Sequence, residues 1–450
     1  MIHRPWLAFL LLFGLFCFTG PYDLHNRDNE AESEGKLQAN IAAKGGNIEE
    51  GNASRRYAVL GLAALAFGLT RRTRARERRG ESVPPDATPG YDRAVAWPII
   101  AFLTLACASV LWADDPGIVP RRVVVLLCLA AAAWAVARAW SLPDILLFNI
   151  LACLAMLVTS LALEVVRGRF QPFDGGYRLA GLTHPNNHAL EAVVVIISSF
   201  FAIRLSPHRR RWYTLAAGLA VVLLLVTRSR TSVLSVILAL GFAMLRTMPK
   251  RRVLGLGLLL AASVLAISVF GPGLVDSARH AALMGRDAST ADIGTLTGRT
   301  ELWGELLTYV AARPLLGYGL GGFWSQTHTA YIALALGWVV GHSHNGYLEV
   351  LLDLGAVGLT LFVIVLGAGI TQALRRLKAN PQSVEALFAV TVLVWVVIAM
   401  LSEKVFPETH YASFLVMVVL ARLAVTAPAW AAARAPLPGV SVTATWRPST

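Results

Sequence analysis

The sequence predicts an all-α, polytopic membrane protein with about twelve transmembrane helices and one long loop that contains a helix of its own. Three observations predict this fold. Only 15% of the 450 residues are charged and 56% are hydrophobic, whereas soluble domains carry roughly 25% charged residues. The shortage of charge extends over nearly the whole chain, which excludes a soluble enzyme with a single anchor. Apolar runs of about 20 residues, the length that crosses a bilayer as a helix, recur along the chain.

The apolar runs give the positions of the predicted spans. The first run follows His3 and Arg4 as in a signal peptide, but it lacks a clear small-residue cleavage site, so we expect an uncleaved helix. The four cysteines all lie in apolar runs, where free Cys acts as a small hydrophobe, and they form no disulfide or metal-binding pattern. The predicted spans are residues 6–20, 57–70, 94–113, 121–140, 142–163, 186–205, 212–227, 231–246, 252–271, 346–372, 383–402 and 411–427.

Short clusters of Lys and Arg predict the orientation of the chain. The formal net charge of +13 would also suit a nucleic-acid-binding protein, but the basic residues sit between apolar runs, which is typical of cytoplasmic loops that face anionic lipid. With the spans above, all four clusters fall on one side of the membrane, namely residues 71–79, 209–211, 250–252 and 375–378. Both termini are then cytoplasmic, and the outer segments are residues 21–56, 164–185 and 272–345.

The outer segment 272–345 is far longer than the 12 to 15 residues or so that a structureless loop usually reaches, so we expect it to carry structure and function. Residues 299–310 predict an amphipathic helix that Pro314 terminates, and residues 317–324 predict a flexible, aromatic turn. The apolar face of this helix is expected to consist of Leu302, Trp303, Leu306, Leu307 and Val310.

Arginines on the outer side are candidate anion-binding residues. Arg228 and Arg230 interrupt an apolar region between two spans, where Arg is costly and runs against the usual charge bias. Guanidinium forks bind phosphate bidentately, and the helix that follows adds its dipole. The alternative is that both side chains merely extend to the interface. Arg299, at the start of the loop helix, is either a further anion-binding residue or an ordinary surface Arg at a helix start, and Arg121 and Arg122 would attract lipid phosphate without a catalytic role.

Histidines mark the point where the long loop re-enters the membrane. His342 and His344 lie there beside Asn and Gly, a setting that suits acid–base chemistry as well as simple hydrogen bonding to lipid head groups. A metal site built from these two residues with His184 and His188 is a weaker interpretation, because the H-x-H spacing suits a strand and no close carboxylate is evident.

Polar groups elsewhere on the outer side complete the candidates. Segment 177–188 leads into a helix that Pro185 and two Asn residues predict to start there, and its side chains suit contacts with sugar hydroxyls. Glu191, Glu349 and Asp353 lie in or near apolar runs. Intramembrane carboxylates are functional candidates by default, although pairing with the outer arginines is an equally good structural use.

Together these features resemble the O-antigen ligase and polymerase family of bacterial envelopes. The family has a T-x-S-R turn between two membrane helices, which is similar to residues 227–230 here. It then has a G-R at the start of a loop helix with a Trp, followed by P-L-L-G-x-G, as at residues 298–303 and 314–319. An H-N-x-Y-L motif comes last, before a helix with an acid and a Gly, as at residues 344–355.

The resemblance implies a glycosyltransferase of the bacterial inner membrane whose active site faces the periplasm. Such an enzyme moves a glycan from undecaprenyl diphosphate to an acceptor hydroxyl with inversion, without a metal or another cofactor. By resemblance, Arg230 and Arg299 hold the diphosphate, and His344 orients or deprotonates the acceptor. Arg228 is not part of the family's usual pattern, so either Arg228 or Arg230 could be the main phosphate-binding residue of the turn. Supporting roles are expected for Asn345, Tyr347, Glu349, His184 and Asn186.

The resemblance also predicts how the chain is organised and what it binds. We expect N-terminal helices in residues 1–176, a ligase-like catalytic region in 177–360 that includes the loop 272–345, and C-terminal helices with a tail in 361–450. The partners are then the lipid-linked donor, membrane lipid and an acceptor glycolipid. Ligation to lipid A–core is slightly favoured over polymerisation onto a second lipid-linked glycan. A secondary transporter is disfavoured, because the chain has no related halves and keeps its charges near the outer face.

Overall fold

The computed structural model describes residues 53–79, 91–174, 177–248, 299–406 and 410–425, together with Gly14, and every regular element among them is a helix. The all-α prediction is therefore confirmed. The predicted spans 6–20 (apart from Gly14) and 252–271, and the first part of the long loop, lie outside these residues. The described elements are α3 (Ala53–Arg78), α4 (Arg93–Ala108), η1 (Ser109–Trp112), α5 (Ile118–Ala139), α6 (Leu142–Val166), α7 (Pro185–Leu205), η2 (Pro207–Arg209), α8 (Arg210–Val226), α9 (Arg230–Thr247), α12 (Arg299–Ala312), α13 (Gln326–Leu336), α14 (Gly346–Ala379), α15 (Val384–Ala399) and α16 (Tyr411–Val425).

The described helices have the length and composition of membrane spans. Six of them are long and apolar enough to cross a bilayer: α4 with η1, α5, α6, α7, α9 and α14. The apolar helices α15 and α16 are shorter. The chain is thus a polytopic membrane protein, and the total of about twelve spans stays a prediction.

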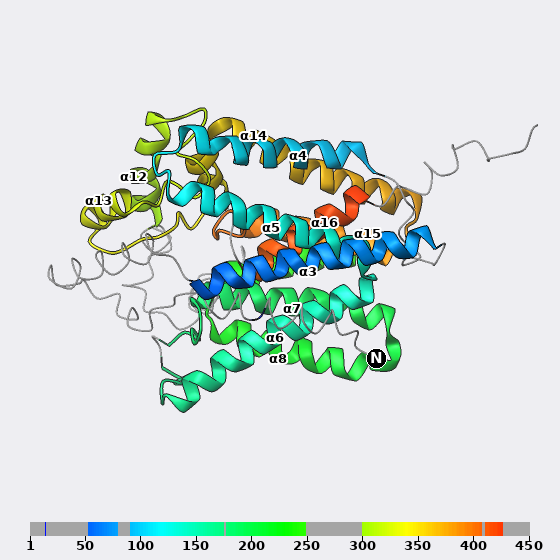
Figure 1. Cartoon of the computed structure of the whole chain (residues 1–450). Helices are drawn as coiled ribbons and strands as arrows, with labels where there is room; N and C mark the ends of the chain where they lie inside the picture. Colours follow the sequence, from blue (N-terminus) through cyan, green and yellow to red (C-terminus); the bar gives the residue numbers. More distant parts are fainter. Residues whose placement is uncertain are drawn as a thin grey trace, which may run out of the picture.

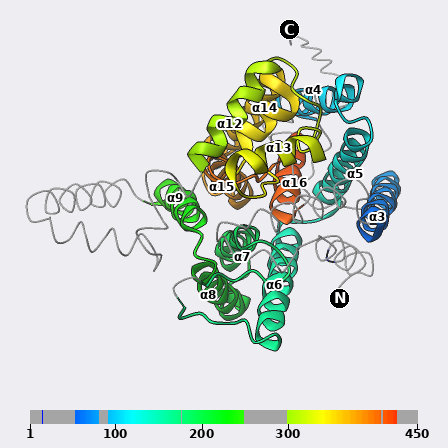
Figure 2. The ribbon, with the colours of Figure 1, turned by 90° about the vertical axis from the view of Figure 1, so that its left-hand side faces the viewer.

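The helices run roughly side by side, and α12 and α13 lie together at one end of the bundle (Figure 1). We call this the loop end. Viewed from there, α6, α7 and α8 form one group, α3, α4, α5, α14, α15 and α16 form another, and α9 contacts α7 and α15 (Figure 2). Large aromatic side chains fill the interior; those that are fully buried include Trp395, Phe148, Phe201, Phe362 and Phe414.

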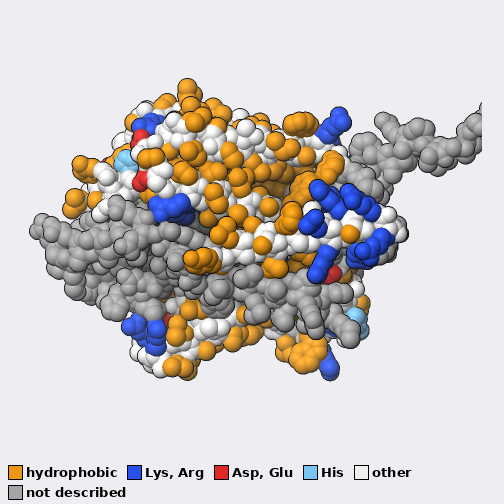
Figure 3. Space-filling view, in the orientation of Figure 1, with side chains coloured by type: hydrophobic (Ala, Val, Ile, Leu, Met, Phe, Trp, Pro, Cys, Tyr) orange, Lys and Arg blue, Asp and Glu red, His pale blue; other side chains and the backbone are white. Residues whose placement is uncertain are grey.

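The basic run at the C-terminal end of α3 lies at the end of the bundle opposite α12 and α13, where blue side chains gather (Figure 3). Apolar side chains cover much of the flank between the two ends (Figure 3). This separation agrees with the charge pattern on which the predicted orientation rests. Which end faces which side of the membrane stays a prediction.

A kink in α14 receives the P-L-L-G segment of the loop. Gly355 has φ 64° and ψ −166°, which breaks the helical hydrogen bonding at that point. The freed amides of Ala356 and Val357 donate to the carbonyl oxygens of Pro314 at 2.8 Å and Leu315 at 3.2 Å. A Cβ on Gly355 would lie 2.2 Å from the carbonyl carbon of Leu315, so only glycine fits. Two motifs far apart in the sequence thus form one backbone joint.

This joint corrects the expectation of a flexible turn at residues 317–324. Tyr318, Phe323 and Trp324 are buried, with exposed fractions of 4%, 0% and 7%. The Tyr318 amide also donates to the Leu352 carbonyl at 2.9 Å. The aromatic residues therefore form the core of the loop region and fix its position on α14.

The loop helix α12 starts at Arg299 as predicted, but its buried face is narrower than expected. Leu302 and Leu306 are fully buried, whereas Leu307 is 53% exposed. Leu307 follows Leu306 by about 100° around the helix axis, which turns it away from the core. Helix α13 was not predicted. Its Ser325 hydroxyl accepts from the His328 amide at 3.3 Å and caps the helix, and Gly337 ends it in a left-handed conformation.

Candidate functional site

A buried carboxylate gathers polar side chains from distant segments at the loop end. Glu403, which follows α15, accepts at Oε1 from Arg299 Nη2 at 3.1 Å and from Asn186 Nδ2 at 2.8 Å. Asn186 Oδ1 accepts in turn from Arg178 Nη2 at 2.5 Å. His184 caps α7 by accepting the Asn186 amide at Nδ1, 3.2 Å away. We call Arg178, His184, Asn186, Arg299 and Glu403 the Glu403 cluster.

The end of α6 sets the position of Arg178. The Glu164 carboxylate accepts hydrogen bonds from the amides of Ala180 at 3.0 Å and Gly181 at 2.8 Å, and from the Tyr177 hydroxyl. These bonds hold the segment that leads into α7 against the membrane helix before it. Arg178 Nε can then donate to the Thr227 carbonyl at 2.9 Å, which connects the cluster to the turn between α8 and α9.

The two arginines of that turn differ in their contacts. Arg228 has a left-handed backbone with φ 51°, and its Nη2 donates to the Asp174 carbonyl at 2.7 Å. Arg230 starts α9 and is partly buried, yet it makes no hydrogen bond or ion pair with any residue that the structure describes. Thr227 and Ser229 are buried and hold the turn, since the Ser229 amide donates to Thr227 Oγ1 at 3.3 Å. Within the described part of the chain, the turn therefore holds Arg230 with no polar partner for its guanidinium.

Arg299 uses both terminal nitrogens within the protein. Nη1 donates to the Ser402 carbonyl at 2.7 Å, and Nη2 pairs with Glu403. These two bonds fix the orientation of the guanidinium, so Arg299 could contact phosphate only through its remaining N–H groups. In the arrangement observed, Arg299 supplies positive potential and ties α12 to the segment after α15.

His344 occupies a strained and well-supported position. Its φ of 52° is uncommon for a residue with a side chain. The centroid of its ring lies 4.0 Å from that of His342 and 6.4 Å from that of His184. The next residue, Asn345, caps α14 by accepting the amides of Tyr347 at 3.0 Å and Leu348 at 3.1 Å. Across the described ranges, no three His, Cys, Asp or Glu side chains are placed to hold a metal ion.

The electrostatics of the cluster are dominated by positive charge. The pKa of His184 is lowered to about 3, first by burial and then by the charges of Arg178, His344, Arg299 and His188. At neutral pH His184 is therefore uncharged, and because Nδ1 accepts a hydrogen bond, Nε2 carries the proton. Burial raises the pKa of Glu403, while Arg299 opposes that shift. An anion would lower the free energy of this arrangement of charges.

The carboxylates singled out in the sequence do not pair with the outer arginines. Glu349 is fully buried and accepts from Lys404 Nζ at 2.7 Å, Trp324 Nε1 at 2.8 Å and the Ser343 amide at 2.9 Å. Glu191 pairs with His188 at 2.8 Å. The structural alternative is thus corrected: Lys404 and His188 are the partners. Tyr347 donates through its hydroxyl to the Val397 carbonyl at 2.9 Å and anchors the start of α14.

The structure thus brings Arg299, His184 and Asn186 into one network, with His344 near His184, and it connects the arginine turn to that network through Thr227. Sequence reasoning included Arg178 only as part of segment 177–188, and it missed Glu403 and Lys404. The signal for the last two was the polar interruption Ser402-Glu403-Lys404 after an apolar run. It is the same kind of signal that drew attention to the arginine turn.

Comparisons with known proteins agree with the geometry. Residues 215–363 match the family model described as O-antigen ligase, and this stretch includes the arginine turn, Arg299 and His344. The chain is also 27% identical over 344 residues to the exopolysaccharide production protein ExoQ of Rhizobium meliloti (strain 1021), covering 73% of this chain and 77% of that protein. The motifs, the all-helical fold and these two matches all point to similarity with the O-antigen ligase and polymerase family.

Proposed function

We propose that this protein transfers a glycan from a polyprenyl diphosphate, expected to be undecaprenyl diphosphate, to an acceptor hydroxyl at the loop end. The similarity to this family supports a membrane enzyme of the ligase and polymerase type. The observation that carries the finer proposal is the arginine-rich cluster in which burial and nearby positive charge keep His184 uncharged, with the His344 ring centred 6.4 Å away. In the same region Arg230 offers a guanidinium with no partner among the described residues.

The reaction assigns one task to each group. His344 takes the proton of the acceptor hydroxyl as its oxygen forms a bond to the anomeric carbon. The bond from that carbon to the phosphate oxygen breaks, and the diphosphate leaves with the electron pair. Arg230 binds the departing oxygens, and Arg178 and Arg299 add positive potential from the cluster. Charge-assisted hydrogen bonds contribute about 1.5–3 kcal/mol each, and more when they meet charge that develops in the transition state. Attack opposite the leaving group inverts the anomeric centre.

Two acceptors fit this chemistry. The sequence slightly favoured ligation of a finished chain to lipid A–core. The relative named for exopolysaccharide production, matched over most of its length, favours the alternative, polymerisation onto a second lipid-linked glycan. We therefore propose polymerisation first and ligation second. In either case we propose the bacterial inner membrane with the loop end facing the periplasm.

The proposal is tested by transfer with purified protein and an undecaprenyl-diphosphate glycan. A positioned base contributes about 10²–10⁴-fold, so His344→Ala should lose a factor in this range. His342→Ala, the matched control on the adjacent ring, should retain most of the rate, and a chelator should have no effect. Equal rates for His344→Ala and wild type would end the general-base role, and inhibition by the chelator would restore the metal interpretation.

Deletion of the gene separates the two acceptors. If the protein is a polymerase, polysaccharide should collapse to single repeat units on a gel. If it is a ligase, free polymer should persist while capped lipopolysaccharide disappears. Reintroducing the wild-type chain controls for secondary effects.

A further inference from the structure

A small cavity that the proposed mechanism does not use lies beside the Glu403 cluster. We call it the polar chamber. It has a volume of about 90 Å³, and its lining includes Arg122, Trp324, Asp353 and Lys404 together with Leu126 and Met417. These residues come from α5, α14, α16 and the segments beside α13 and α15.

The polar chamber contains groups that call for a ligand. Asp353 is 1% exposed, and neither carboxylate oxygen makes a hydrogen bond, although the Gly321 amide lies beside it. A buried carboxylate without donors is costly, so a donor from a ligand would stabilise it. Arg122 is exposed and forms no ion pair or hydrogen bond within the described part of the chain. The chamber thus offers an acceptor for hydroxyls and a donor for anionic oxygens.

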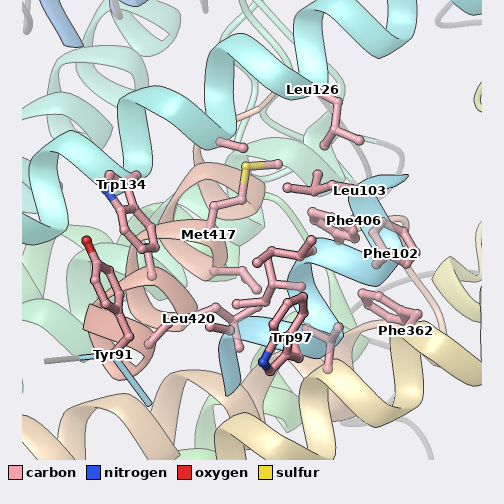
Figure 4. A pocket seen from close by; sticks show the side chains of 18 of the residues that line it. Tyr91, Trp97, Phe102, Leu103, Leu126, Trp134, Phe362, Phe406, Met417 and Leu420 are labelled. Atoms are coloured by element: carbon pink, nitrogen blue, oxygen red, sulfur yellow. The ribbon is translucent and has the colours of Figure 1, made fainter. Parts of the chain in front are cut away.

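An apolar groove adjoins the chamber. It has a volume of about 480 Å³ and lies between α4, α5, α14 and α16, with Trp97, Phe102, Trp134 and Phe362 among its lining (Figure 4). Its lining is mostly apolar, with polar groups only at Arg93, the Tyr91 hydroxyl and the indole N–H of Trp97 and Trp134. Leu126 and Met417 line both the groove and the chamber. A single amphipathic molecule can therefore place its head group in the chamber and its hydrocarbon chain in the groove.

The chamber is also joined to the catalytic candidates. Lys404 directly follows Glu403, which holds Arg299. Glu349, the partner of Lys404, accepts the amide of Ser343, the residue before His344. A head group in the chamber would therefore lie against the two segments that carry Glu403 and His344, with its glycan close to the general base.

We propose that the polar chamber and the apolar groove form the binding site of the acceptor, a lipid-linked glycan with one polyprenyl chain. Its phosphate oxygens meet Arg122 and Lys404, its hydroxyls meet Asp353, and its chain lies in the groove. The assignment as acceptor rests on the proposed transfer reaction. The donor diphosphate binds separately, at Arg230.

The test uses benzophenone-tagged undecaprenyl diphosphate and the full chain in phosphatidylcholine nanodiscs, with cross-linked peptides identified by mass spectrometry. Label should appear on α4, α5 and α16 around Phe102 and Met417. Arg122→Gln should lower this labelling about tenfold, because it removes a charge-assisted contact with the phosphate oxygens of the probe. Arg121→Gln is the matched control, because Arg121 Nε donates to the Gly117 carbonyl at 2.6 Å and does not line the chamber. Arg230→Ala, which removes the proposed donor contact, should leave labelling of the groove unchanged.

Three results would overturn the proposal. Labelling only outside the groove would remove the site, and loss of groove labelling in Arg230→Ala would assign the groove to the donor chain. Displacement of the probe by an equal amount of phosphatidylglycerol would make the groove a site for bulk membrane lipid. Failure of the proposed transfer reaction is recognised separately: wild-type protein would then label in the groove but form no product.

Discussion

The turn between α8 and α9 and the start of α12 both bring arginine to the loop end, but in opposite states. Arg299 has Nη1 on the Ser402 carbonyl and Nη2 on Glu403, and its side chain is 15% exposed. Arg230 is partly buried as well, yet no described residue contacts its guanidinium with a polar atom. The first arginine is part of a closed network, and the second is open to a ligand.

This difference separates direct phosphate binding from a positioning role, although the sequence motifs alone suggest phosphate binding for both arginines. Removing one partner from a buried ion pair leaves an uncompensated charge, so Arg299 and Glu403 hold each other and the elements that bear them. Burial, and then the charges of Arg178, His344 and Arg299, lower the pKa of His184 and keep it uncharged. An unpaired guanidinium has no such internal role and is available to bind phosphate through its fork. We infer that Arg230 contacts the diphosphate directly and that Arg299 acts mainly through position and potential.

The largest expected effect is on the open arginine. Arg230→Ala should reduce transfer by about 10²–10³-fold, the loss typical of removing one donor to developing charge. Arg230→Lys should recover little, because an ammonium lacks the planar fork. Arg228→Ala is the matched control and should cost less, since Arg228 is held by the Asp174 carbonyl. Steady-state transfer by folded, monodisperse protein is the measurement. A greater loss in Arg228→Ala than in Arg230→Ala would reverse the assignment of the clamp.

The closed network should show its effect first in stability. Glu403→Gln keeps an oxygen for Asn186 but removes the charge that pairs with Arg299. Because hydrogen bonds to charged groups contribute about 1.5–3 kcal/mol, the free energy of unfolding should fall by that order. The control is Glu77→Gln, which breaks the exposed pair with Arg138 at 2.6 Å and should cost no more than about 1 kcal/mol. Equal losses in the two variants would show that the Glu403 network is not a stabilising unit.

The same contrast shows what the sequence could predict. The sequence predicted helices with strong apolar runs well, because α6, α7 and α14 begin at or within one residue of the start of the corresponding predicted span. Local chemistry accounts for this, since Pro185 and Asn345 mark helix starts in the sequence itself. Motif residues such as Arg299 and His344 were likewise recognised one by one, because their types and positions in the chain are visible without a structure.

What the sequence could not show depends on contacts between distant segments. Asn186 and Glu403 are 217 positions apart, so their hydrogen bond has no local signature. The docking of the P-L-L-G segment on Gly355 is equally non-local, and it turned a predicted flexible segment into a buried one. The occupied state of Arg299 and the open state of Arg230 follow only from such contacts.

The smallest effect concerns pH and the uncharged His184. Its pKa in the folded protein is about 3, against 6.5 for an ordinary His. As the pH falls below about 6.5, the unfolded chain binds a proton at this position and the folded chain does not. The free energy of unfolding should therefore decrease, with a slope from this residue of at most about 1.4 kcal/mol per pH unit. Glu403 acts in the opposite direction, because its raised pKa lets the folded state take up a proton first.

The experiment uses His184→Asn, which removes the titrating ring but retains a residue that caps helices well. Thermal unfolding followed by tryptophan fluorescence should show a shallower loss of stability for this variant than for wild type between about pH 7 and about pH 5. In the Glu403→Gln background the loss should become steeper, because the opposing proton uptake is gone. If His184→Asn and wild type lose stability in parallel, His184 is charged in the folded state, and burial together with the positive potential at the Glu403 cluster is too weak to hold it neutral.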